Sequence, residues 1–472
     1  MIVRAQSAQR WSPGTFPLQS MESGGRYVLL VAFSYPPVER IGALRPAGLA
    51  KYLPSFGWIP VVLTAGRPEA CRTERNVFET PYRDVLACWK AKLGLDPSRG
   101  VHQQFGLPVA AKPDSRFAHT RILRAVKGIL TYPDPSKGWI PFAREALAEI
   151  ARRYRIEAII STAPPFTAHM IASEAKPLLN CPWVADYRDL WNTHTLTMGE
   201  RTGLAAAIMR RTEWRTIRHA DALVTVSEPW AERLRRRYGS HRVAAIANGF
   251  DAEEIPPPPN PLTREFTITH TGQFYEGRRD PTELLRAVRE LIDEGSLAES
   301  DLRLRFYGPV EPFLINLLSE LRLEQVSEVH ASIPRNKCLE VQRESQILLL
   351  LTWWNPEESG VLTGKVYEYL GSRRPILAVG GGRGAITELL EHTQAGVQTL
   401  SKEKTKEVLR EWYGLYRHLG QVPYHGDSGA IMQHTHREMA RKYAALLNAI
   451  ARASDSPRLV ETGGAPPMGR MA

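Results

Sequence analysis

Short apolar segments alternate with longer amphipathic ones along the first half of the chain. β-rich apolar runs occupy 27–33, 59–65, 157–162, 183–188 and 222–227, and helical patterns such as 43–57 and 167–179 lie between them. Strands that alternate with helices are typical of a parallel sheet covered by helices. The pattern therefore predicts an α/β, Rossmann-like domain over 26–250.

A proline-rich segment interrupts this alternation. Residues 253–265, EEIPPPPNPLTRE, contain four consecutive prolines, which suit neither a helix interior nor a sheet. We expect a stiff extended linker over 251–264. The alternation then restarts, with apolar runs at 266–274, 302–308, 345–352 and 375–380. It predicts a second Rossmann-like domain over 265–430. Open sheets of this kind bind ligands at the carboxyl ends of their strands.

The two ends of the chain differ in pattern. Segment 431–453 is expected to form a C-terminal amphipathic helix, whose apolar stripe consists of Met439, Tyr443, Leu446, Leu447 and Ile450. Residues 454–472 have the Gly and Pro content of a disordered tail, and 1–25 are also expected to be disordered. Because the structured pattern begins after that segment, translation from Met21 instead of Met1 is an open alternative.

Composition narrows the class of protein. At 472 residues the chain is too long for one core, and its 43% hydrophobic and 24% charged residues are in the ordinary soluble range. No apolar run approaches the roughly 20 residues that a membrane-spanning helix needs. The opening residues lack the apolar core of a signal peptide, so we expect a cytoplasmic protein. Cys71, Cys88, Cys181 and Cys338 are scattered, which indicates a reduced protein without metal.

The net charge of +11 favours anionic partners such as nucleotides, phospholipid head groups or nucleic acid. Much of the excess lies in 211–220 and 232–242. Runs of this kind are often only solvated helix faces. Charge alone therefore does not choose among the partners, although no nucleic-acid motif accompanies it.

Three positions of the first half follow predicted strands and could carry chemistry. Gly42 lies in a strand-to-helix loop, where it either lets backbone N–H groups approach an anion or only serves the turn. His169 lies in the first turn of a predicted helix, as a donor or general base or as a surface or core histidine satisfied by the backbone. Asp186, with Arg188 and Asp189, either forms an ion-pair network or binds a polar substrate.

The second half repeats the strand, glycine turn and helix. Gly272 frees the backbone, and Arg278 and Arg279 supply cations just before a helix that Asp280 and Pro281 are expected to start. That arrangement fits polyanion recognition, although exposed arginines before a helix are common.

A lysine and a glutamate three residues apart form the strongest candidate pair. If Gly364 opens a helix, Lys365 lies in its first turn and Glu368 lies one turn on, on nearly the same face. A nucleotide offers phosphate to the lysine and a ribose diol to the carboxylate. The alternative is a surface ion pair that contributes only ~0.3 kcal/mol.

These residues lie in a familiar motif. TGKVYEYLGSRRPILAV, 363–379, resembles the nucleotide-sugar signature of retaining glycosyltransferases of family four. These enzymes have the GT-B fold, two Rossmann-like domains whose parallel sheets face a central cleft. The similarity covers roughly 27–450 through several blocks in the same order, and YPDPSKGWIPFARE, 132–145, resembles a segment of bacterial members that build surface polysaccharides.

The resemblance implies roles for the candidate residues. Glu368 corresponds to the second glutamate of the family's paired-glutamate motif and would hold the donor's ribose. Lys365, with one or both of Arg278 and Arg279, would face the diphosphate. Gly42 would lie where the N-terminal loop approaches the donor phosphate and the acceptor.

One position departs from the family pattern. Gly360 stands where the first motif glutamate is expected, and Glu357 or Glu358, just upstream, would have to substitute for it. The departure bears on the contact with the donor sugar.

The resemblance implies a retaining glycosyltransferase that moves a sugar from a nucleoside diphosphate sugar to an acceptor hydroxyl, in cell-surface polysaccharide or glycoconjugate biosynthesis. It implies no metal and no cofactor beyond the donor substrate, and His169 or Asp186 would orient the acceptor or the donor sugar. A nucleotide-sugar epimerase and a non-catalytic nucleotide-binding scaffold remain alternatives, because fold likeness does not exclude them.

A second hypothesis concerns the location of the enzyme. Arginines of the segment 203–220 stand beside Leu204, Ile208, Met209 and Trp214. This combination suggests reversible contact with an anionic membrane that carries a glycan or lipid-linked acceptor. The protein would then be cytoplasmic and peripheral at the inner face of the cell membrane.

Overall fold

The structure is a computed structural model that describes residues 25–38, 41–66, 73–74, 76–92, 132–191, 203–239, 241–255, 261–352 and 360–455. Most of the two terminal segments expected to be disordered lies outside these ranges, as do the four prolines of the linker and Glu358.

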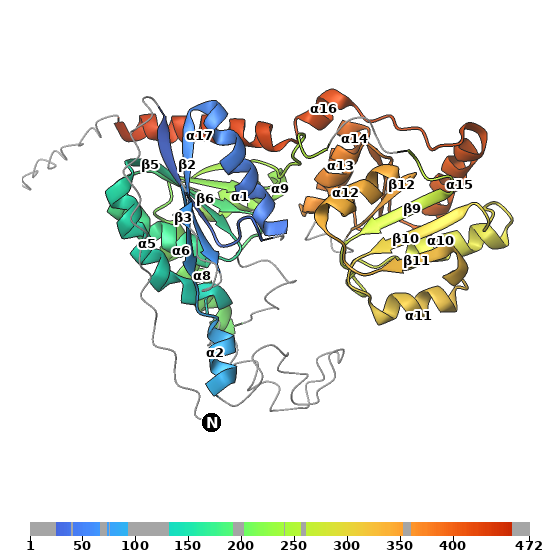
Figure 1. Cartoon of the computed structure of the whole chain (residues 1–472), viewed down its shortest axis with the longest axis horizontal. Helices are drawn as coiled ribbons and strands as arrows, with labels where there is room; N and C mark the ends of the chain where they lie inside the picture. The colour runs from blue at the N-terminus through green and yellow to red at the C-terminus, as the bar shows by residue number, and fades with distance from the viewer. Residues whose placement is uncertain are drawn as a thin grey trace, which may run out of the picture.

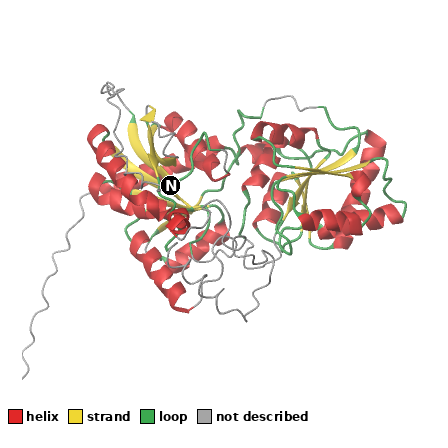
Figure 2. Cartoon of the chain, turned by 60° about the horizontal axis from the view of Figure 1, so that its bottom comes forward, coloured by secondary structure: helices red, strands yellow, loops and turns green. Residues whose placement is uncertain are grey.

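Two α/β domains follow one another along the chain, each with a sheet between helices (Figures 1 and 2). The first sheet consists of β1 (Arg26–Ala32), β2 (Trp58–Gly66), β3 (Thr73–Glu74), β4 (Val77–Pro81), β5 (Ile156–Ala163), β6 (Trp183–Tyr187), β7 (Ala222–Thr225) and β8 (Arg242–Ala245). Its order is β3-β4-β2-β1-β5-β6-β7-β8, and every pair is parallel except β3 with β4.

The second sheet is entirely parallel. It consists of β9 (Phe266–Thr271), β10 (Leu302–Tyr307), β11 (Ser327–His330), β12 (Ile347–Leu351), β13 (Ile376–Val379) and β14 (Gly396–Thr399). Its order is β11-β10-β9-β12-β13-β14. The predicted pair of Rossmann-like domains is thereby confirmed.

Helices connect the strands in both domains. In the first domain they are α1 (Ile41–Tyr52), η1 (Leu53–Phe56), α2 (Val85–Lys92), η3 (Pro135–Trp139), α5 (Ile140–Arg153), α6 (Thr167–Leu179), α8 (Gly203–Ile217) and α9 (Glu228–Arg237). In the second they are α10 (Thr282–Asp293), α11 (Pro312–Glu320), η4 (Glu324–Val326), α12 (Arg335–Glu344), α13 (Gly364–Ser372), α14 (Ala385–Thr393), α15 (Lys402–Leu419) and α16 (Ser428–Met432). No helix within the described ranges combines the length and the apolar character of a membrane span.

The central strands are apolar on both faces because helices cover both. On β1, Leu29 and Val31 enter one buried cluster while Val28 and Leu30 enter the cluster on the opposite face. The strand β12 divides its leucines between two clusters in the same way. Continuous apolar runs are the expected sequence pattern of strands buried on both sides.

The last helix, α17 (His436–Asp455), returns to the first domain (Figure 1). Four members of its predicted apolar stripe are buried against that domain's sheet, namely Met439, Tyr443, Leu447 and Ile450. The chain thus crosses between the domains twice, and the two crossings pair with each other. The Phe250 N–H donates to the His434 carbonyl at 3.1 Å, and the His436 N–H donates to the Phe250 carbonyl at 2.8 Å.

Candidate active site

Two helix N-termini, one from each domain, meet between the sheets. α1 begins at Ile41 and α13 begins at Gly364, as the sequence predicted for the second. The Ile41 side chain lies 3.5 Å from where a Cβ of residue 364 would be. Helix N-termini carry partial positive charge and free N–H groups. Two neighbouring helix N-termini together favour a bound anion.

Lys365 lies in the first turn of α13 and reaches across to the end of β9. Its Nζ is 3.2 Å from Nε2 of His270. A Cβ at Gly272, which has a φ of +130°, would collide with the Lys365 amine. The glycine therefore serves both the turn and the close approach of the lysine, so the structure brings these two predicted residues together.

His270 was not found from the sequence. It is buried at the end of β9, and its Nδ1 lies 3.0 Å from the Leu349 carbonyl. A carbonyl oxygen only accepts, so Nδ1 donates and Nε2 accepts from Lys365. Burial, followed by the positive charge of Lys365, holds the pKa of His270 well below its ordinary value. The one signal available was a histidine among the threonines at the end of a buried strand.

The charge on Lys365 is poorly compensated. Burial, followed by the positive charge of Arg279, lowers the pKa of Lys365 to about 7, while Glu368 acts in the opposite direction. An anion bound beside Lys365 would favour the protonated, ammonium form of this lysine. Of the two predicted arginines, Arg279 is the half-buried one that acts on Lys365, whereas Arg278 is exposed.

The loop that carries the two arginines is a tight turn. The Tyr275 N–H donates to the Arg279 carbonyl at 3.0 Å, and the Arg279 N–H donates to the Tyr275 carbonyl at 2.8 Å. Asp280 accepts from the N–H groups of Gly277 and Thr282, and α10 begins at Thr282. The helix that Asp280 and Pro281 were expected to start therefore begins one residue after Pro281.

Glu368 lies one turn after Lys365 and is paired. Its Oε1 accepts from Nη1 of Arg335, the first residue of α12. Nη2 of the same arginine is 3.1 Å from Oε2 of Glu254, which belongs to the first crossing between the domains. Only 12% of the Glu368 side chain is exposed. Sequence reasoning missed Arg335, which is distant along the chain and belongs to no motif.

Gly42 lies in the first turn of α1, and its carbonyl accepts a hydrogen bond from Arg188. Nη1 of Arg188 donates to the Gly42 carbonyl at 2.6 Å, and the same guanidinium also donates to the Ala163 and Pro164 carbonyls. A Cβ at Gly42 would lie 2.7 Å from that nitrogen. The glycine is therefore needed for the contact that fixes the start of α1 to the carboxyl ends of β5 and β6.

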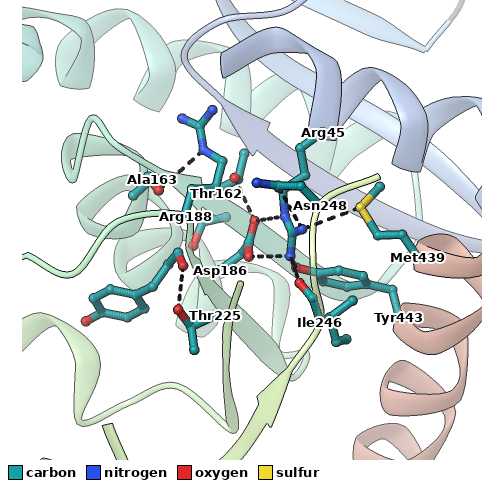
Figure 3. Close-up of polar contacts among 12 residues, drawn as sticks. Arg45, Thr162, Ala163, Asp186, Arg188, Thr225, Ile246, Asn248, Met439 and Tyr443 are labelled. Atoms are coloured by element: carbon teal, nitrogen blue, oxygen red, sulfur yellow. Dashed lines mark hydrogen bonds and ion pairs between the residues drawn. The ribbon is translucent and has the colours of Figure 1, made fainter. Parts of the chain in front are cut away.

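Asp186 is fully buried beneath this edge of the sheet (Figure 3). Its Oδ2 and Oδ1 accept from Nε and Nη2 of Arg45 at 2.9 and 3.0 Å, and Oδ2 also accepts from the Thr162 hydroxyl at 2.7 Å. Burial raises the pKa of Asp186, but the charge of Arg45 and the hydrogen bonds from Arg45 and Thr162 together outweigh it and hold that pKa below its ordinary value. Asp186 thus lies in an ion pair, but its partner is Arg45, whereas the guanidinium of Arg188 binds backbone carbonyls.

Arg45 uses its remaining N–H groups to join three parts of the chain (Figure 3). It donates to the Tyr443 hydroxyl on α17 at 2.8 Å and to the Ile246 carbonyl at 2.9 Å. It also donates to the Ala247 carbonyl at 3.0 Å. The network thus ties α1 to both crossings between the domains.

His169 is also fully buried, on the opposite face of β5. Its Nδ1 lies 2.8 Å from the Ser161 hydroxyl, and the ring is surrounded by Phe166, Trp183 and Tyr187. Burial lowers its pKa to about 3, so the ring is neutral at neutral pH. The catalytic roles of His169 and Asp186 stay predictions, and their burial does not favour them.

Known proteins resemble this chain in sequence over part of its length and in fold over most of it. Residues 106–254 match the sequence model of Glycosyltransferase Family 4. No curated protein sequence matches the chain significantly. Part of the chain is thus similar to Glycosyltransferase Family 4, and the chain as a whole has the GT-B fold.

Solved structures show the same fold at low sequence identity. HepE from Anabaena, in complex with UDP and glucose, is 12% identical with a TM-score of 0.58, over 90% of this chain and 100% of that one. Sucrose-phosphate synthase from Thermosynechococcus elongatus is 13% identical with a TM-score of 0.53, over 91% and 97%. A glycosyltransferase from Rickettsia africae is 12% identical with a TM-score of 0.54, over 90% and 98%.

The departure at Gly360 has a steric basis in this structure. A Cβ at residue 360 would lie 2.7 Å from Cδ1 of Trp230 and 3.1 Å from Cβ of Pro229, both near the start of α9. The neighbouring Val361 packs against the buried cluster of the first domain. The loop before α13 thus contacts the opposite domain, and a larger side chain does not fit there.

We predict that Asp186→Ala lowers the free energy of unfolding by about 3–5 kcal/mol, because it leaves the buried Arg45 guanidinium unpaired. Urea unfolding followed by tryptophan fluorescence measures this. The control is Glu174→Ala, which removes an exposed pair with Arg144 at 2.7 Å and costs at most about 1 kcal/mol. Equal losses in the two variants would contradict the account of the network.

We predict that Gly360→Ala lowers the free energy of unfolding by about 1–3 kcal/mol, because the added methyl group overlaps the Trp230 indole. Gly414→Ala on α15 is the matched control, since nothing lies within 4 Å of a Cβ at that position. It is expected to stabilise by about 0.5–1 kcal/mol. Chemical denaturation compares the two, and a neutral Gly360→Ala would rule out the tight contact.

Proposed function

We propose that this protein is a glycosyltransferase that transfers a sugar from a nucleoside diphosphate sugar to an acceptor hydroxyl with retention of configuration. The observation that carries the proposal is the meeting of the α1 and α13 N-termini around Lys365. A diphosphate is an anion of the size and charge that such a cleft favours. The UDP and glucose in the HepE complex support a donor of this class.

The chemistry would depend on the leaving group. As the bond to the sugar breaks, negative charge grows on the diphosphate, and groups already aimed at it lower the barrier. Lys365, Arg279 and the N–H groups of the two helix starts are placed for this role. Because its pKa is about 7, Lys365 is only partly protonated at neutral pH, and a bound anion would favour its protonated form.

The donor's nucleoside would be held by α13. Glu368 stands one turn beyond Lys365, so a diphosphate at the lysine places a ribose near the carboxylate. A carboxylate accepts two hydroxyl hydrogen bonds, which suits a vicinal diol. Gly42 and the start of α1 would complete the cleft from the acceptor side. The proposal includes no metal and no cofactor.

The product would be a cell-surface polysaccharide or glycoconjugate. The resemblance of residues 132–145 to bacterial polysaccharide enzymes supports this choice. Transfer to a supplied acceptor would distinguish it from a nucleotide-sugar epimerase, which forms its product without any acceptor, and from a scaffold, which binds without turnover.

We predict that one nucleoside diphosphate among UDP, GDP, ADP and dTDP raises the melting temperature of the protein and that Glu368→Ala removes most of this shift. Loss of a charged hydrogen-bond acceptor costs about 1.5–3 kcal/mol of binding, or about tenfold to more than hundredfold in affinity. Glu403→Ala, an exposed position on α15, is the control. An unchanged shift in Glu368→Ala would reject the ribose assignment.

We further propose that the outer face of α8 contacts an anionic membrane. Arg210, Arg211 and Arg215 are exposed there beside Ile208 and Trp214, whose exposed fractions are 45% and 51%. The one acidic residue of α8 points inward.

That residue, Glu213, is buried and pairs with Arg237 at 2.8 Å. Among the described residues, no carboxylate forms an ion pair with the three exposed arginines. Cations around an exposed tryptophan suit an anionic lipid surface and would bring the enzyme to a lipid-linked acceptor.

We predict that the protein floats with vesicles containing phosphatidylglycerol at low salt and that replacing Arg210, Arg211 and Arg215 by Gln abolishes flotation. Each cation near the surface contributes about 1 kcal/mol. Replacing Arg286, Arg383 and Arg410 by Gln changes the net charge equally and should leave flotation intact. Flotation that persists in the first triple variant would refute the α8 surface.

A further inference from the structure

The carboxylate proposed to bind ribose already has a cation attached to it. Arg335 donates to Oε1 of Glu368 through Nη1. Its Nη2 and Nε lie 3.1 and 3.4 Å from Oε2 of Glu254. The exposed fractions of the Arg335 and Glu368 side chains are 26% and 12%. Water therefore screens this pair less than it screens an ordinary surface pair.

The arginine is held from two sides. It is the first residue of α12, Glu368 contacts it from α13, and Glu254 contacts it from the crossing between the domains. A guanidinium bound by two carboxylates has few alternative rotamers. The Glu368 carboxylate is therefore fixed in one orientation, and Oε2 has no hydrogen bond to any described residue.

We propose that Arg335 is the positioning residue of the ribose site, which holds Oε1 of Glu368 so that Oε2 faces the vicinal diol. This inference rests on the proposed role of Glu368 in donor binding. A fixed acceptor loses less conformational freedom when a ligand binds, so the geometry raises selectivity for the diol.

Arg335 also separates the two charges of α13. Without it, the nearest mobile cation to Glu368 is Lys365, three residues earlier on the same helix, and Glu368 already acts on that lysine electrostatically. A Lys365–Glu368 pair would withdraw the lysine from the diphosphate. In addition, the arginine offsets a carboxylate that would otherwise repel the donor's phosphates.

The test compares ribose with deoxyribose. Isothermal titration calorimetry would measure binding of UDP, GDP and ADP and of their 2′-deoxy counterparts dUDP, dGDP and dADP. For the base that binds best, we expect the wild type to prefer ribose about tenfold, which corresponds to ~1.4 kcal/mol. In Arg335→Gln the preference should fall below about threefold, and Arg335→Lys should recover part of it.

The matched control is Glu254→Gln, which removes the other partner of Arg335 and leaves its bond to Glu368. This variant should retain most of the preference. A purely structural role of Arg335 would weaken ribose and deoxyribose ligands alike and leave their ratio unchanged.

The possible failures are distinguishable. If the wild type binds none of the six nucleotides, the proposed function fails, and this inference fails with it. If the wild type prefers ribose and Arg335→Gln keeps the full preference, the proposed function stands and the role of Arg335 is overturned. Loss of the preference in Arg335→Gln with partial recovery in Arg335→Lys supports the proposal.

Discussion

The buried ion pair between Arg45 and Asp186 is the contact on which the rest of the arrangement depends. Two charges removed from water are tolerable only if each has a complete set of partners, and here both have them. Arg45 follows Gly42 by one turn on α1, so the pair that fixes the helix also fixes the helix start that enters the cleft. Arg45 also donates to the Tyr443 hydroxyl on α17 and to the Ile246 carbonyl just after β8. The same pair therefore fixes the segments of the first domain that lead to and from the second domain.

In the second domain, charged side chains are stabilised in a different way. The groups proposed to bind the donor are partly buried, and each has a polar partner from another element: Lys365 has His270 and Glu368 has Arg335. These partners keep the lysine and the glutamate apart although helical spacing would let them pair. Under the proposed function, a nucleoside diphosphate would then meet an amine and a carboxylate that are oriented separately. Preorganisation of this kind is what transition-state stabilisation requires.

Sequence analysis predicted the features of the fold and the site that depend on local residue patterns. Alternating apolar runs are enough for two Rossmann-like domains, because a doubly covered strand must be apolar on both faces. The stripe of α17 and the spacing of Lys365 and Glu368 are equally local. Arg45, His270 and Arg335 were missed because their partners lie far along the chain. Asp186 illustrates the same gap, since an acid at a strand end looks accessible until its buried counter-ion is known.

Gly360 shows how packing between domains can alter a motif. At this position the family resemblance leads one to expect an acid, but a side chain there would overlap Trp230 of the opposite domain. Val361 occupies the adjacent space against the same cluster. An acid could be accommodated only if the Trp230 indole or the segment before α13 moved. The glycine therefore lets this segment pack tightly against α9, and under the proposed function other residues would contact the donor sugar.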